Sequence, residues 1–150
     1  MYDDYEDYND EANDPTPGTY NIDYTKETKH KDYNEEHGVI YRIWNTDGTA
    51  TLYSIDTDEV KLSDMYPLLG ENCRLAQSLP GTNYKMWVDE ESKMSNEWQE
   101  NINYEATQRW QDVAAETQGW QWLYDNYNGF VHNYDCVAYK AIEIIKGEVN

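Results

Sequence analysis

The pattern of apolar and polar positions is clearest after residue 37, where two segments typical of β-strands flank a turn. Residues 38–44 are mostly β-branched or aromatic, residues 45–48 carry an Asp-Gly pair, and residues 49–55 alternate between two faces. An Asp-Gly turn between such segments favours a β-hairpin. Residues 73–79 and 84–88, joined by a Pro-Gly turn, predict a second hairpin.

A short helix is expected between the two hairpins, over residues 60–69. Ser63 and Asp64 could provide its N-terminal cap, or Pro67 could lie in its first turn. Gly70 then ends the helix, since glycine is the residue most often found just after a helix.

A longer helix is expected over residues 101–117, where apolar residues recur at spacings of three or four and Gly119 follows. Residues 120–124 could form one more helical turn or a strand, and a last strand is expected around residues 137–142. The order of elements predicts an α+β fold: a mostly antiparallel sheet of about five strands with two or three helices. The apolar strand residues expected to be mostly buried are Trp44, Leu52, Leu75, Trp87 and Val137.

The composition changes near residue 37. Residues 1–36 hold 12 acidic and 3 basic residues with six tyrosines and no tryptophan, so they lack the apolar material for a core of their own. We therefore expect residues 1–36 to be an acidic, tyrosine-rich arm, partly disordered or docked, and residues 37–150 to be a single α+β domain.

The net charge limits the classes of partner that this chain can bind. The 150 residues include 30 acidic and 11 basic ones, a formal net charge of −19. Direct binding to nucleic acid or to anionic lipid is disfavoured, because phosphate contacts need clustered Lys and Arg. The sequence has no apolar run long enough to span a membrane, and its first residues lack the basic and apolar regions of a secretory signal. These features favour a cytoplasmic protein.

No residue pattern indicates a reaction. The three histidines, His30, His37 and His132, belong to no nucleophile or zinc motif, and no glycine-rich phosphate loop is present. His132 and Cys136 are four positions apart, but two ligands do not make a zinc site. The two cysteines, Cys73 and Cys136, are expected to be reduced. The sequence thus favours a protein that is not an enzyme and has no cofactor or metal.

The carboxylates are densest in residues 3–7, 56–59 and 89–91. Neither of the last two runs has the twelve-residue spacing of a calcium loop with its central glycine, so a solvated surface is favoured over a calcium site in both. The first run is interpreted as a flexible polyanion. Nineteen charges equal those of roughly nine or ten base pairs of duplex DNA. The residues predicted to form a partner-binding acidic surface are Asp3, Asp4, Glu6, Asp7, Asp56, Asp58, Glu59, Asp89, Glu90 and Glu91.

Tryptophan and tyrosine are abundant, with six and 15 copies against one phenylalanine. Aromatic side chains dominate the energetics of many interfaces. The aromatic residues predicted to be anchors for a partner, or to form a pocket for a ligand or peptide, are Trp98, Trp110, Trp120 and Trp122.

Residues 39–110 carry a resemblance that bears on the biological setting. The positions involved are Leu68, Leu69 and Gly70, then Val88, Asp89, Glu90 and Lys93, and then Asn103, Ala106 and Thr107. In these positions the chain resembles a small uncharacterised domain found in phages, plasmids and other mobile elements. The resemblance implies an accessory gene of a phage or mobile element, a setting where proteins that disarm host defences are common.

Charge and resemblance together lead to one hypothesis and two alternatives. The hypothesis is a non-enzymatic DNA or RNA mimic in the host cytoplasm that binds and inhibits a basic, nucleic-acid-handling host protein, such as a restriction enzyme or a CRISPR effector. The alternatives are a small binding module with a Trp/Tyr pocket and a structural component of a virion.

Overall fold

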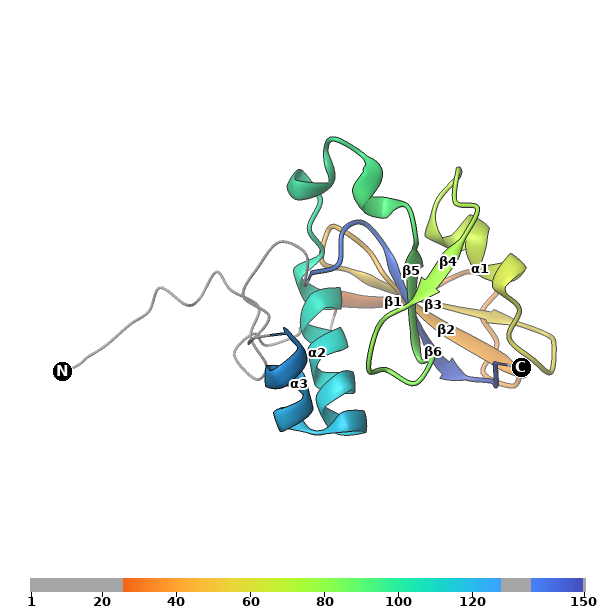
Figure 1. Ribbon diagram of the computed structural model, residues 1–150. Coiled ribbons are helices and arrows are strands. Elements are labelled where there is room, and N and C mark those ends of the chain that lie inside the picture. The colour runs from red at the N-terminus through yellow and green to blue at the C-terminus, as the bar shows by residue number, and fades with distance from the viewer. Residues whose placement is uncertain (1–25, 128–135, 150) are drawn as a thin grey trace.

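Six β-strands form one mixed sheet in the computed structural model, which describes residues 26–127 and 136–149 (Figure 1). Their spatial order is β1-β3-β2-β6-β5-β4. The strands are β1 (Glu27–Lys29), β2 (Val39–Trp44), β3 (Ala50–Ile55), β4 (Ala76–Ser78), β5 (Met86–Asp89) and β6 (Ala141–Lys146). The described helices are α1 (Leu62–Leu69), α2 (Tyr104–Gln118) and α3 (Trp120–Tyr127), with short 3₁₀ turns η3 (Ser92–Met94) and η4 (Trp98–Glu100). The predicted α+β class is confirmed.

Both predicted hairpins are present. Strands β2 and β3 pair antiparallel around a turn in which Gly48 has a φ of 89°, a conformation that glycine adopts without strain. Strands β4 and β5 also pair antiparallel, with Gln77 opposite Val88. Strand β6 lies between β2 and β5 and is antiparallel to both, so it joins the two hairpins into one sheet.

Strand β1 extends the sheet into the segment that the sequence assigned to the arm. It pairs in parallel with β3, with Glu27 opposite Ala50, which makes the sheet mixed. Residues 27–29 therefore belong to the sheet. The four acidic candidates nearest the N-terminus lie outside the described residues: Asp3, Asp4, Glu6 and Asp7.

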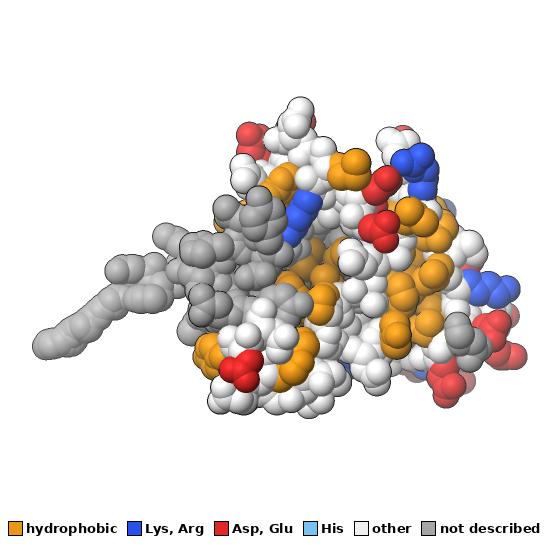
Figure 2. Space-filling view, viewed as in Figure 1, with side chains coloured by type: hydrophobic (Ala, Val, Ile, Leu, Met, Phe, Trp, Pro, Cys, Tyr) orange, Lys and Arg blue, Asp and Glu red, His pale blue; other side chains and the backbone are white. Residues whose placement is uncertain are grey.

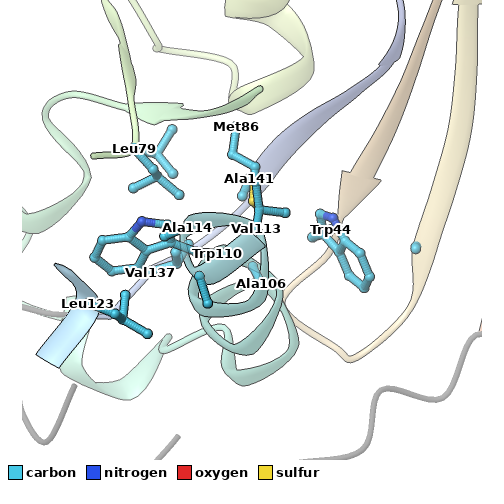
Figure 3. Packing of buried hydrophobic residues seen from close by; sticks show 13 residues of the cluster. Trp44, Leu79, Met86, Ala106, Trp110, Val113, Ala114, Leu123, Val137 and Ala141 are labelled. Atoms are coloured by element: carbon cyan, nitrogen blue, oxygen red, sulfur yellow. The ribbon is translucent and has the colours of Figure 1, made fainter. Parts of the chain in front are cut away.

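The sheet separates two apolar clusters, because side chains alternate between its faces. Figure 1 places α2 and α3 on one side of the sheet and α1 on the other. The cluster on the α2 side includes Trp44, Met86, Trp110, Val113, Leu123 and Val137, all of which are labelled in Figure 3. The cluster on the α1 side includes Tyr41, Ile43, Met65, Leu69, Trp87 and Ile142.

Three of the five core residues named from the sequence are buried. Trp44, Trp87 and Val137 are at most 6% exposed. Leu52 is only half-buried. The prediction for Leu75 was wrong: the residue is 47% exposed, because β4 begins at Ala76 and Leu75 precedes it.

The helix ends differ in part from the sequence expectation. Gly119 ends α2, as predicted, and residues 120–124 are helical rather than extended. Helix α1 begins after Lys61 without a side-chain cap, so Ser63 and Asp64 lie within its first turn. Pro67 lies inside α1 rather than in its first turn. None of the helices in the described ranges is long and apolar enough to cross a bilayer.

The last strand lies further along the chain than predicted. Residues 137 and 138 are apolar because they belong to the core beside α2, and not because they are in a regular strand. The backbone N–H of Val137 donates to the Thr107 hydroxyl at 2.9 Å, and its carbonyl accepts from the N–H of Asn103 at 2.8 Å. These bonds tie the segment to the start of α2, and the strand β6 begins only at Ala141.

Candidate partner-binding surface

A buried carboxylate lies between the sheet and α2. Glu143, in β6, is fully buried and carries hydrogen bonds from three side chains. Arg109 of α2 donates to both of its oxygens, with Nη2 at 2.8 Å from Oε2. Arg42 and the indole N–H of Trp44, both in β2, each donate to Oε1 at 3.2 Å. Arg42 also reaches Glu27 of β1, with Nε at 2.6 Å from Oε2. We call Glu27, Arg42, Arg109 and Glu143 the buried ion cluster.

The cluster keeps Glu143 ionised. Burial alone raises the pKa of this carboxyl group, but the hydrogen bonds and charge of Arg109, together with the charge of Arg42, outweigh burial and hold the pKa below its usual range. The side chains of Arg42 and Arg109 are only 17% and 18% exposed. Their positive charges therefore neutralise internal carboxylates, and they offset little of the negative charge on the surface.

Three chain segments meet at the end of the sheet where β3 and β6 finish. The backbone N–H of Asn34 donates to the Ser54 hydroxyl at 2.8 Å, and the ring of His37 contacts the same oxygen. The N–H of Val60 donates to the carbonyl of Glu148 at 3.0 Å. Lys146 reaches the carbonyl of Glu35 at 3.3 Å. Residues 34–38, 54–60 and 146–149 are thus held side by side.

This junction gathers exposed carboxylates from all three segments. Two exposed lysines, Lys61 and Lys146, lie among them. Figure 2 shows acidic side chains, in red, at the right-hand end of the view, where Figure 1 places the C-terminus. We call this surface the acidic end, and its carboxylates are those of Glu35, Glu36, Asp56, Asp58, Glu59 and Glu148.

The sequence predicted only half of the acidic end. Asp56, Asp58 and Glu59 were named from their local density. Glu35 and Glu36 were assigned to the arm, and Glu148 was not singled out. No local sequence signal joins them to the acidic end, because residues 34–38 and 146–149 reach residues 54–60 through contacts between segments far apart in the chain.

The second predicted acidic group is less available than the sequence suggested. Glu91 accepts two hydrogen bonds from Arg74, both at 3.1 Å. Asp89 accepts from the backbone N–H of Glu91 at 2.9 Å, and both carboxylates are half-buried. Glu90 is exposed. The group lies at the open end of the second hairpin, away from its turn. The expectation of a solvated surface therefore holds for Glu90 and only in part for Asp89 and Glu91, which are half-buried and hydrogen-bonded.

The four tryptophans proposed as anchors have different environments. Trp110 is 3% exposed and belongs to the core, with its indole N–H donating to the carbonyl of Pro80 at 2.8 Å. Trp122 packs against the same core. Trp98 is half-buried and carries the ammonium of Lys93 5.1 Å from its ring centre. Trp120 is 49% exposed on α3. Burial of Trp110 contradicts its assignment as a surface anchor.

A cavity of about 250 Å³ lies between β4, β5 and α2. Its walls include Leu79, Trp110 and Val137, which lie close together in Figure 3. Asp89 and Glu90 also line it. Trp110 therefore contributes to a cavity from the core side and not from the surface.

Within residues 26–127 and 136–149, no group of three or more His, Cys, Asp or Glu side chains is arranged to hold a metal ion. Cys73 and Cys136 are half-buried and are not joined in a disulfide. Burial and the neighbouring Asp89 carboxylate raise the pKa of the Cys73 thiol, which disfavours its reactive thiolate form. His132 lies outside the described residues.

No protein-family model, curated protein or solved structure matches this chain.

Proposed function

We propose that this protein is a non-enzymatic polyanion that binds a basic, nucleic-acid-handling host protein and occupies the groove in which that protein holds DNA or RNA. A restriction enzyme or a CRISPR effector is the target class, and an accessory gene of a phage or mobile element is the setting, as the resemblance over residues 39–110 implies. Inhibition would follow from competition for the same basic groove.

The observation that carries this proposal is the uneven distribution of charge between the inside and the outside of the domain. Arg42 and Arg109 are directed at Glu143 and are mostly buried. The acidic end presents six exposed carboxylates with two lysines among them. Arg74 is the exception, since it is exposed and pairs with Glu91. A surface that keeps its carboxylates exposed while two of the three arginines are paired with an internal carboxylate is suited to a basic partner, and such surfaces accelerate encounter as well as binding.

The test compares two triple variants that carry the same change of charge. The first reverses the acidic end with Asp56→Lys, Asp58→Lys and Glu59→Lys. The control reverses exposed carboxylates before and on α2, with Glu97→Lys, Glu100→Lys and Glu116→Lys. Each tagged protein is used to recover its partner from host lysate at low salt, and the affinity for the recovered, purified partner is then measured.

We expect the acidic-end variant to lose at least about tenfold in affinity, because three attractions become repulsions. The control should lose much less. Equal losses would mean that net charge alone matters and that the acidic end is not the contact surface. Unchanged affinity in both variants would contradict a polyanion function.

A further inference from the structure

Strand β4 forms one outer edge of the sheet, and no further strand of residues 26–127 and 136–149 pairs with it. The carbonyl of Leu75 and the N–H of Leu79 are hydrogen-bonded on the side of β5, at 3.0 and 2.8 Å. Because inward and outward groups alternate along an antiparallel strand, the N–H and carbonyl groups of Ala76 and Ser78 point away from β5. These groups can pair with another strand.

The cavity between β4, β5 and α2 reaches the surface beside this edge. Gln77, in the middle of β4, is exposed, lines the cavity and lies opposite Val88. Both side chains face α2, since Val88 belongs to the cluster on that side and directly opposed residues share a face of the sheet. A strand added beside β4 would therefore direct the side chain next to Gln77 at the mouth of the cavity.

The lining of the cavity favours an apolar occupant. Its apolar walls come from four segments: Leu79, Val88, Trp110 and Val137. The indole N–H of Trp110 already donates to the carbonyl of Pro80 at 2.8 Å, so this side chain offers the cavity carbon rather than an unpaired donor. Glu90 and Lys93, which also line the cavity, are opposite in charge. An uncharged side chain thus suits it best.

The volume and the surroundings of the cavity fit one side chain of an extended segment. At about 250 Å³ the cavity lies just below the range of pockets that enclose drug-sized molecules. Leu75 is 47% exposed, lies two residues before Gln77 and therefore faces the same side. An added strand would cover this leucine with its next side chain on that face.

The net charge decides between two occupants of the edge. A second copy of this chain would bring its own formal charge of −19 to the contact, and like charges repel. A segment of another protein that has basic rather than acidic residues around its aliphatic residue is electrostatically complementary to this chain. A separate partner is therefore the better-matched occupant.

We propose that the edge of β4 and the cavity together bind an extended peptide segment of another protein by β-strand addition. The segment lies antiparallel to β4, and its residues opposite Ala76 and Ser78 exchange main-chain hydrogen bonds with them. The residue between these two, opposite Gln77, places an aliphatic side chain in the cavity. The main-chain bonds provide affinity, and the cavity provides selectivity for the side chain.

The test is a titration of the full chain with blocked peptides, followed through the main-chain N–H signals of Ala76 and Ser78 and the indole N–H signal of Trp110 in NMR spectra. The first peptide is Lys-Thr-Val-Leu-Val-Thr-Lys. Its controls replace Leu by Ala, replace both Lys by Glu, or carry N-methyl groups on both Val residues, which supply the donors to β4. The Leu peptide should bind at least about fivefold more tightly than each control.

Three variants separate the edge from the cavity. Ser78→Pro removes an outward N–H of β4, at an edge position where proline is tolerated, and should weaken binding of the Leu peptide about tenfold. Ser78→Ala keeps this N–H and should bind as the natural protein does. Gln77→Tyr narrows the mouth of the cavity and should abolish the preference for Leu over Ala. If Ser78→Pro does not fold, the N-methylated peptide tests the same hydrogen bonds with the protein unchanged.

Three results would overturn the proposal: no binding of the Leu peptide, equal affinity for the Leu and Ala peptides, or binding that neither N-methylation nor Ser78→Pro weakens. The outcome is independent of partner capture, because Val88 pairs with Ala141 at the start of β6 and the acidic end lies at the close of that strand. If the peptide binds but the acidic-end variant retains its host partner, the peptide site stands and the polyanion function fails. If the peptide does not bind but the acidic-end variant loses its partner, the reverse holds.

Discussion

The buried ion cluster and the acidic end use the same carboxylate chemistry under opposite conditions. Glu143 has no exposed surface, and its hydrogen-bonding partners come from β2 and α2. The carboxylates of the acidic end are exposed and outnumber the lysines among them. A buried charge must be compensated, because desolvation costs several kcal/mol per ion, whereas an exposed one is stabilised by water. The comparison indicates that Glu143 serves folding and that the acidic end is available for binding.

Removing the buried carboxylate should have the largest effect on stability. Glu143→Gln leaves Arg42 and Arg109 without their shared counter-charge, and it should lower the free energy of unfolding by about 3–5 kcal/mol. Urea denaturation followed by tryptophan fluorescence measures this value. The matched control is Glu148→Gln at the acidic end, which makes the same chemical change on an exposed side chain and should be nearly neutral.

The stability that Glu143 provides should fall as the pH is lowered. Its pKa is held below the usual value in the folded state. Its contribution is therefore fully present above the unfolded-state pKa of about 4.3, and it is lost as the pH falls through the lower folded-state value. The difference in unfolding free energy between the natural protein and Glu143→Gln should shrink as the pH falls below about 4. A difference that stays constant down to pH about 2 would contradict an ionised, paired Glu143.

A smaller loss of stability is expected from changing Gly38, where the backbone of residues 34–38 lies against that of residues 54–60 in the acidic end. An added Cβ at Gly38 would lie 2.1 Å from the carbonyl oxygen of Thr57, and backbone cannot easily move aside. Gly38→Ala should therefore cost about 1–3 kcal/mol and separate residues 34–38 from residues 54–60. Gly70→Ala is the control, since nothing lies within 4 Å of its added Cβ. Equal thermal stability of the two variants would show that this close approach is not required.

The smallest effect on stability should come from the acidic-end reversals themselves. Asp56→Lys, Asp58→Lys and Glu59→Lys together should change the free energy of unfolding by no more than about 0.5 kcal/mol, because these side chains are exposed. Calorimetric melting of the variant beside the natural protein measures this. A large loss would mean that these carboxylates stabilise the fold, and the contrast with Glu143 would disappear.

The sequence predicted the elements whose signals are local. The hairpin of β2 and β3 follows from an Asp-Gly turn between alternating segments, and the end of α2 follows from Gly119. Strand β6 was misplaced because its identity depends on distant residues. From the sequence alone, Glu143 looks like a surface residue. The arginines that pair with it, Arg42 and Arg109, are 101 and 34 positions away in the chain. A buried charge in a strand cannot be recognised without its partners.

The same limit applies to the candidate site. Asp56, Asp58 and Glu59 are neighbours in sequence, so their density was visible. Glu148 is far from them in sequence and is brought beside them by the hydrogen bond from the N–H of Val60 to its carbonyl and by the bridge between Val60 and Val149. Glu91, which looked like a free carboxylate, is paired with Arg74 at a separation of 17 positions. The sequence gives the number of charges, but only the fold decides which of them remain exposed and grouped.

The most direct measurement is the dissociation constant of the complex with the recovered host partner, determined as salt rises from about 50 to about 200 mM and repeated with duplex DNA as a competitor. A polyanion in a basic groove loses affinity steeply over this range, and DNA displaces it. The acidic-end variant should show a shallower dependence on salt than the natural protein. An affinity that changes neither with salt concentration nor in the presence of competing DNA would contradict the polyanion function.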